Sequence, residues 1–245
     1  VLAQHISFLR DWLRSYKPLT DAQADTVEIL LEQLYRERGI TKETDMSVLR
    51  HEDFPLLCEL YALLERQAGG SGVFTDETLR ELRLHLHSLC VGPDSLYFNG
   101  HTNIGSGRFV TFGVKSLLEA GQNLRDAMLF NIFSYMNNEL LCAGNTVAAI
   151  DELYLYLNNK TAIGYIRACM KRARKKESSL LLASQNVEDF LLPEAAELTK
   201  PLFSIPAYQF LFHPGTVDGG KYREALQLEE CEYGVVRSCA RGNCL

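Results

Sequence analysis

The sequence lacks several features that would assign a chain to a class of protein at sight. It has no run of roughly 18 consecutive apolar residues, the length that a membrane-spanning helix needs, and it shows no signal peptide. No internal repeat or low-complexity tract occurs in it. We therefore expect no transmembrane segment and an ordinary globular fold.

Its cysteines and histidines do not form a metal-binding pattern. The seven cysteines are scattered, and no two of them make a C-x-x-C pair. His85 and His87 form a close pair, but on a helix this spacing directs the two rings to different faces. Because an odd number of irregularly spaced cysteines is typical of reduced thiols, the sequence predicts a cytosolic protein without such a metal site.

Charge and composition set looser limits. Acidic residues outnumber basic ones by 31 to 25, which gives a net charge of −6. This balance argues weakly against bulk electrostatic binding of nucleic acid, although a local basic patch would still allow contact with DNA. A hydrophobic fraction of 47% over 245 residues is enough for a real core, in one large domain or two small ones.

Residues 1–94 have the pattern of an all-helical subdomain. The predicted helices span 1–16, 20–38, 53–67 and 76–90, with a flexible glycine-rich link at 69–72. Thr20 and Gln23 make a capping box at the start of the second helix, and Gly39 ends it. Pro55 suits the first turn of the third helix.

Residues 95–245 change to an alternation of strands and helices. The predicted strands are 108–114, 146–150, 179–184 and 207–212, and the predicted helices are 122–141 and 161–176. Short, continuously apolar strands separated by helices are typical of a parallel sheet covered on both faces. The sequence therefore predicts an α/β fold, with a mainly parallel sheet flanked by helices and the all-helical subdomain beside it.

The strongest chemical motif is the apolar strand that ends in Asp151 and Glu152. This is the Walker B arrangement, which delivers two carboxylates to the ligand-binding edge of a sheet. There an aspartate can hold Mg²⁺ through water, and the next glutamate can orient or deprotonate an attacking water. The alternative is a helix with acidic residues in its first turn, which the helix dipole favours anyway.

The next apolar strand ends in a polar amide, Gln185. Motor ATPases present a polar sensor to the γ-phosphate at this neighbouring strand end, and an amide can both donate to a phosphate oxygen and accept from water. The alternative is a helix cap or turn residue. Two consecutive strands that both end in such groups favour the functional interpretation.

A basic run, 171–176, separates these two strands. One interpretation is cations at a helix C-terminus, stabilised by the dipole and solvated. A second is an arginine finger, in which Arg172 or Arg174 offers a planar guanidinium to the γ-phosphate of a neighbouring subunit. A third and weaker interpretation is a patch that faces DNA.

Two glycine-rich segments imitate phosphate-binding loops. Gly215, Gly220 and Lys221 match the Walker A pattern, but Tyr222 stands where the pattern needs Ser or Thr as the Mg²⁺ ligand. We interpret this segment as a connecting loop. The segment 105–107 is followed by no lysine and is interpreted as a turn.

These motifs together resemble one family. The words Ile150–Leu157, Arg172-x-Arg174-Lys175 and Ala183–Phe190 are similar to those of the VirB-four-like/TraC-like ATPases, which energise type IV secretion and conjugative DNA transfer. The resemblance covers the chain from about Leu96 onward, and the helical part more loosely. The Asp-Glu and Ser-Gln words are shared by related RecA-like motors, whereas Val-Glu-Asp-Phe is more specific to this family.

The resemblance implies a RecA-like P-loop NTPase core over 95–245, with 1–94 as the family's helical subdomain. It implies ATP and Mg²⁺ as cofactors, bound at the interfaces of a homo-oligomer that is a hexamer in this family. Other secretion subunits and a coupling ATPase are the implied partners, and DNA contact is a further one. The implied location is the cytoplasm, at the inner face of the bacterial cell membrane.

The resemblance also carries roles over to single residues. Asp151 would be the Walker B aspartate that holds Mg²⁺, Glu152 the catalytic glutamate and Gln185 the polar sensor. Arg174 best matches the interfacial arginine, with Arg172 as second choice. Arg241 would approach the nucleotide.

One part of the family's pattern is missing. Its Walker A loop and first core strand are expected upstream of the helical subdomain, so we expect this chain to start after them and to be inactive alone. The function predicted for the intact protein is an ATPase motor of secretion or conjugation. The alternatives are a DNA translocase of the FtsK/HerA type and a docking module that does not need nucleotide.

Overall fold

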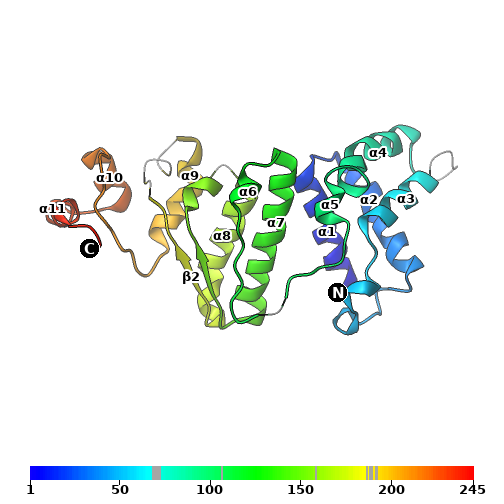
Figure 1. The fold of residues 1–245 in the computed structure, drawn as a ribbon, viewed down its shortest axis with the longest axis horizontal. Helices are drawn as coiled ribbons and strands as arrows, with labels where there is room; N and C mark the ends of the chain where they lie inside the picture. Colours follow the sequence, from blue (N-terminus) through cyan, green and yellow to red (C-terminus); the bar gives the residue numbers. More distant parts are fainter. Residues whose placement is uncertain (68–72, 106, 158, 186, 188–189, 191–192) are drawn as a thin grey trace. The chain divides into compact units, whose positions relative to one another are not determined.

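The computed structural model describes the chain except for residues 68–72, 106, 158, 186, 188–189 and 191–192. The chain forms two compact units, Val1–Met128 and Leu129–Leu245. The division falls inside one long helix, α7 (Gln122–Asn138). Figure 1 traces the order of the elements along the chain.

The first unit is helical throughout its described elements. Its α-helices are α1 (Leu2–Tyr16), α2 (Asp21–Glu37), α3 (Leu57–Arg66), α4 (Asp76–Cys90), α5 (Ser95–Phe98), α6 (Lys115–Leu118) and the start of α7, with the 3-10 turns η1 (Met46–Val48) and η2 (His51–Asp53). The helices predicted for 1–16, 20–38 and 76–90 are thereby confirmed. The predicted glycine link at 69–72 lies outside the described residues.

The ends of α2 show how local sequence fixes this unit. The Thr20 hydroxyl accepts from the Gln23 amide at 3.3 Å, and the Gln23 side chain accepts from the Thr20 amide at 2.9 Å. This reciprocal capping box satisfies two N–H groups that would otherwise lack partners. At the other end Gly39 takes φ +75°, and the Ile40 N–H donates to the Tyr35 carbonyl at 2.9 Å. Both boundaries are therefore set by the residues that predicted them.

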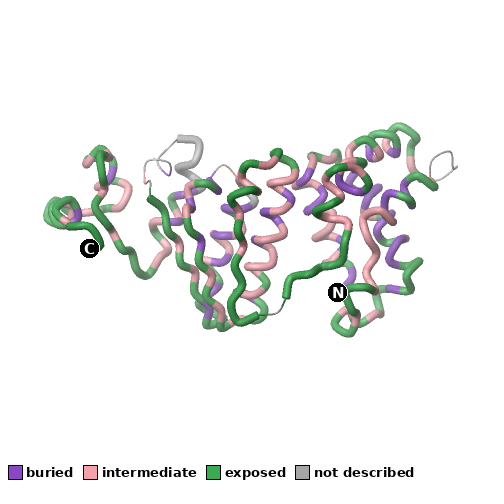
Figure 2. The backbone as a smooth tube through the Cα atoms, in the orientation of Figure 1, coloured by how far each residue is buried: buried purple, intermediate pink, exposed green. Residues whose placement is uncertain are grey.

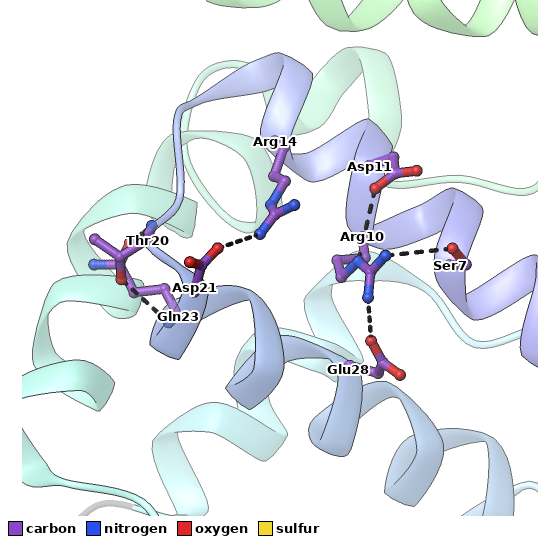
Figure 3. Close-up of polar contacts among 8 residues, drawn as sticks. All are labelled: Ser7, Arg10, Asp11, Arg14, Thr20, Asp21, Gln23 and Glu28. Carbon is purple, nitrogen blue, oxygen red and sulfur yellow. Dashed lines mark hydrogen bonds and ion pairs between the residues drawn. The ribbon is translucent and has the colours of Figure 1, made fainter.

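The core of the unit lies between the faces of α1 to α4, where buried and exposed residues alternate along each helix (Figure 2). Trp12 and Tyr16 pack edge-on against Phe98. The Tyr16 hydroxyl donates to Asp94 at 2.6 Å, and burial together with this bond raises the pKa of Tyr16 to about 12. At the edge of this core, an ion pair joins Arg10 of α1 to Glu28 of α2 at 2.5 Å (Figure 3).

The predicted start of the third helix is wrong. Residues 51–53 form the short turn η2, Phe54 is extended with φ −80° and ψ 140°, and α3 begins only at Leu57. The physical reason is Pro55, because the ring of a proline disfavours the helical conformation of the residue before it. The proline therefore precedes the helix.

The second unit contains helices and a small sheet. Its elements are the rest of α7, the π-helical turn η3 (Glu139–Ala143), β1 (Val147–Ile150), η4 (Leu153–Tyr156), α8 (Lys160–Arg172), η5 (Ala173–Lys176), β2 (Ser179–Leu182), α9 (Pro193–Ser204), α10 (Gly219–Leu226) and α11 (Glu230–Ser238). In both units, no described helix has the length and apolar character that a membrane crossing requires.

The sheet consists of β1 and β2, which pair in parallel with Val147 opposite Ser179 and Ile150 opposite Leu182 (Figure 1). This confirms that the two strands are parallel neighbours. On one face, Ala148 and Leu180 pack against the buried cluster of Leu140, Leu141, Cys169 and Ala173. Burial raises the pKa of the Cys169 thiol to about 11, so this thiol remains protonated at neutral pH.

The expectation that helices cover both faces of the sheet is wrong for the described chain. Val147 is 73% exposed and Leu181 is 56% exposed, and both stand on the face opposite the cluster. The two strands alternate apolar residues between a packed and an open face, as the pleat requires. Their continuous apolar sequence is the composition of a doubly covered strand, although one face is open here.

Two predicted strands are also wrong, because 108–114 and 207–212 contain no strand. A strand needs a neighbour for its backbone hydrogen bonds, whatever its residue types. In the second segment Leu211 alone exchanges both backbone bonds with another residue, Leu245, at 3.0 and 2.9 Å. Apolar β-forming sequence was present at both places without a partner strand.

Leu82→Ala is expected to destabilise the first unit by about 2–5 kcal/mol, because Leu82 is completely buried and its loss leaves a cavity. Leu84→Ala on the same helix is the matched control, since Leu84 is 70% exposed and its loss should change stability by less than about 0.5 kcal/mol. Urea unfolding followed by fluorescence of Trp12, the one tryptophan, measures both. Equal losses in the two variants would contradict the assigned core.

Candidate functional site

The candidate site lies where β1 and β2 end. Because the strands are parallel and Ile150 stands opposite Leu182, their carboxyl ends reach the same edge of the sheet. Pairing continues beyond the last strand residues, since the Ala183 N–H donates to the Ile150 carbonyl and the Leu153 N–H donates to the Ala183 carbonyl, each at 2.9 Å. The residues that follow the strands are thus held side by side.

The structure brings two of the predicted site residues into contact. The Gln185 side-chain amide donates a hydrogen bond to Oε1 of Glu152. The contact joins side chains 33 positions apart in sequence, and it exists because both follow paired strand ends. Glu152 and Gln185 therefore share one polar site, while the chemical roles predicted for them remain predictions.

Glu152 has an unusual backbone conformation. Its φ of 50° and ψ of 49° place it in the left-handed region, which costs a residue with a side chain roughly 1–2 kcal/mol. Its N–H donates to Oδ1 of Asp151 at 2.9 Å, and the buried Leu153 follows at once in η4. The sharp turn from strand to buried helix thus holds both carboxylates at the strand end. Conformations of this kind persist where surrounding structure enforces them, often at functional sites.

The carboxylates suit a metal that keeps most of its water. Oε2 of Glu152 is buried and has no hydrogen-bond partner among the described residues. Asp151 is exposed at the strand end. Within the described part of the chain, no three His, Cys, Asp or Glu side chains group as a metal cage. Mg²⁺ is usually held by one or two carboxylates together with water and phosphate, so this donor set fits it.

The predicted arginines lie at the opposite end of β2. Arg172 ends α8 and Arg174 lies in η5, and both precede the strand, whereas Gln185 follows it. A strand advances about 3.3 Å per residue, so the four residues of β2 separate the two groups by roughly 13 Å. Arg172 and Arg174 are exposed, and no contact of the described residues joins either one to Glu152. The structure therefore keeps them away from the site of their own chain.

The remaining predicted residues lie in the C-terminal part. Arg241 is exposed in a turn closed by the bond from the Asn243 N–H to the Ala240 carbonyl, at 3.0 Å. None of the contacts found among described residues connects Arg241 to Asp151, Glu152 or Gln185. The Walker A-like segment leads into α10, where Asp218 accepts from the Lys221 N–H at 2.9 Å. In a phosphate-binding loop, the free N–H groups at the start of the helix bind phosphate. Here Asp218 occupies that position as the N-cap of α10.

One structural residue of the site was not predicted. Gly144 precedes β1 with φ +76°, and a Cβ added there would lie 2.9 Å from the Lys176 carbonyl oxygen. The next residue, Asn145, has φ 48° and donates to that carbonyl at 2.9 Å. This turn ties the start of β1 to the segment before β2 and so fixes the register. A Gly-Asn pair before an apolar strand is a turn signal, so this turn could have been predicted from the sequence.

The chain is similar to known proteins. No family model matches the chain. The structure of VirB4 of Thermoanaerobacter pseudethanolicus superposes on 98% of the chain with a TM-score of 0.81 and 31% sequence identity. A probable conjugal transfer protein TrbE of Sinorhizobium fredii (strain NBRC 101917 / NGR234) is 28% identical over 113 residues, which are 45% of the chain.

These matches confirm the resemblance drawn from the sequence motifs, because the chain is similar to VirB4 and to a TrbE conjugal transfer protein. The chain spans 65% of the VirB4 chain, and the matched residues make up 17% of the TrbE protein.

Gly144→Ala is expected to destabilise the second unit by about 1–3 kcal/mol, because it forces a side chain into a glycine conformation and against the Lys176 carbonyl. Gly164→Ala in α8 should act in the opposite direction, by about 0.5–1 kcal/mol, since nothing lies within 4 Å of its added Cβ and alanine favours a helix. Urea unfolding followed by circular dichroism compares the two. If Gly144→Ala left stability unchanged, the turn would not be the anchor described.

Proposed function

We propose that this chain carries the Mg²⁺ and hydrolysis half of a RecA-like ATPase site, in a motor that energises type IV secretion or conjugative transfer. The observation that supports it is the contact between Glu152 and Gln185 at the carboxyl edge of two parallel strands. It occurs in a chain that resembles VirB4 over 98% of its length. ATP and Mg²⁺ are the cofactors that this proposal requires.

In this proposal the two carboxylates divide the work. Bound Mg²⁺ would supply charge neutralisation for a transferring phosphate. Asp151 is exposed and would hold the metal through water, while Glu152, the next residue at the same strand end, would accept the proton of an attacking water. The left-handed turn at Glu152 keeps that carboxylate in place, so little reorganisation is needed when a proton is taken.

In the same proposal Gln185 contacts both Glu152 and a phosphate oxygen of the nucleotide. Its amide already donates to Glu152, which orients the carboxylate, and its remaining N–H is suited to a phosphate oxygen. Arg174 has no part in the site of its own chain in this proposal. Because β2 separates it from Gln185, we infer that it acts on the site of a neighbouring subunit in a homo-oligomer, with Arg172 as the second candidate. Arg241 is proposed to approach the nucleotide only in that assembly.

The setting of the whole protein is also a proposal. The match to a conjugal transfer protein favours conjugation over a general DNA translocase. Other secretion subunits and a coupling ATPase are the partners proposed for a hexameric motor at the inner face of the cell membrane, with DNA contact through the basic run. A docking module that ignores nucleotide is the competing function, and nucleotide binding by the wild type separates the two.

Glu152→Gln in the full-length protein is expected to keep nucleotide binding and to lose about 10²–10⁴ in turnover, because the amide keeps the size and the contact with Gln185 but cannot accept a proton. Glu177→Gln is the matched control, since Glu177 is also left-handed, with φ 54°, but lies before β2. Steady-state ATP hydrolysis and nucleotide affinity are measured for both. Unchanged turnover in Glu152→Gln would exclude the base, and no nucleotide binding by the wild type would favour a docking module.

The proposed role of Arg174 as an arginine finger between subunits is tested by mixing two slow variants. Arg174→Ala and Glu152→Gln should each hydrolyse ATP slowly alone. Mixed oligomers should regain turnover, because an intact Glu152 in one subunit then meets an intact Arg174 from its neighbour. Size-exclusion chromatography verifies that mixed oligomers form. If they form without regained hydrolysis, Arg174 does not act between subunits, and the same mixture made with Arg172→Ala then tests the second candidate.

A further inference from the structure

A cavity lies in the C-terminal part of the chain, between the 215–218 loop and the helices α10 and α11. Its volume is about 400 Å³. Sites for small molecules commonly measure roughly 300–1,000 Å³, so the cavity has room for a ligand larger than a single phosphate ion. None of the residues proposed for hydrolysis lines it.

The charged side chains that line the cavity are both basic. Arg223 comes from α10 and Arg237 from α11, and no carboxylate is among the lining residues. Tyr233 also lines the cavity and lies four positions before Arg237, so both face the same side of α11. Two arginines from two helices therefore line one hollow together with an aromatic residue.

One of these guanidinium groups is incompletely satisfied. Arg223 makes an ion pair with Glu230 through its Nη1 atom, whereas its Nε is buried and has no hydrogen-bond partner in the described part of the chain. A buried donor without a partner costs free energy unless a ligand or water accepts from it. Arg223, one of the residues that line the cavity, therefore has a donor that its own chain leaves unpaired among the described residues.

The loop on the other side of the cavity is held close to α11. A Cβ added to Gly219 would lie 2.6 Å from the Tyr233 hydroxyl, so a larger residue there would require the Tyr233 side chain to move. The cap from Asp218 to the Lys221 N–H fixes where the loop enters α10. Thr216 also lines the cavity, and a threonine hydroxyl is able to donate a hydrogen bond.

We propose that this cavity binds a small ligand through its phosphate group. Guanidinium forks match the geometry of phosphate and bind it through two parallel hydrogen bonds. The remaining volume and the Tyr233 ring suit an organic part of the size of a nucleoside. Because the site uses Arg223, Arg237 and Thr216, it stands independently of the hydrolysis proposed at Glu152.

The test is calorimetric titration of the 245-residue chain with inorganic phosphate, AMP and adenosine. Phosphate and AMP are expected to bind and adenosine is not, since the phosphate carries the recognition. Binding of AMP tighter than phosphate identifies a nucleotide as the source of the group, and equal binding identifies free phosphate. If neither bound at millimolar concentration, or if adenosine bound as well as AMP, the proposal would be overturned.

Arg237→Gln is the decisive variant, because Arg237 is exposed and its replacement spares the ion pair between Arg223 and Glu230. It should weaken phosphate and AMP binding by about tenfold or more, as expected for loss of a charged hydrogen bond. Arg237→Lys keeps the charge without the fork and should lie in between. Arg80→Gln makes the same charge change at an exposed residue of α4, outside the cavity, and should bind phosphate and AMP like the wild type.

Two results would count against the cavity specifically. Equal binding by the wild type and Arg237→Gln, with circular dichroism unchanged, would show that the ligand sits elsewhere. Loss of AMP binding in Glu152→Gln but not in Arg237→Gln would place the nucleotide at the hydrolysis site. Conversely, loss in Arg237→Gln alone would support the cavity even if the ATPase experiments failed, so the two proposals fail separately.

Discussion

The parallel pairing of β1 with β2 is the constraint on which the polar site depends. Its register places Ile150 opposite Leu182, and the backbone bonds continue to Ala183 and Leu153. Since side chains alternate along a strand, a slip of one residue would exchange the packed and open faces of the slipped strand. The contact between Glu152 and Gln185 therefore follows from the ladder, and neither side chain creates it alone.

Packing on one side of the sheet keeps that register. Ala148 and Leu180 rest on a buried cluster that includes Cys169, whose thiol is shielded enough for its pKa to rise to about 11. At the other end of the strands, the turn at Gly144 locks the start of β1 to the Lys176 carbonyl. The buried cluster and the strained turn at Gly144 thus hold the polar residues at the strand ends in place, and those residues contribute little stability themselves.

The same two strands separate opposite charges along their length. Asp151 and Glu152 follow β1, whereas the basic run from Lys171 to Lys176 precedes β2. In a parallel pair these positions are opposite ends, so the carboxylates do not pair with the arginines of their own chain. Among the described residues, no ion pair joins Glu152 to a cationic side chain, and the proposed function takes this cation from a neighbouring subunit.

Local sequence determined the elements whose ends or spacing are fixed by neighbouring residues. The capping box of Thr20 and Gln23, the left-handed Gly39, and the apolar strands before Asp151 and before Gln185 all lie where the sequence predicted them. The motif order was also enough for the resemblance to VirB4-like ATPases.

Tertiary structure decided what depends on partners distant in the chain. Whether 108–114 and 207–212 become strands depends on a neighbour that accepts their backbone bonds, and their composition cannot supply one. The cavity lined by Arg223 and Arg237 joins residues of α10 and α11, and Gly219 lies close to Tyr233 beside it. The sequence by itself determined the residue types at the two strand ends. Only the parallel ladder decided that Glu152 and Gln185 meet, because hydrogen bonds between strands, and not proximity in sequence, set which residues share an edge.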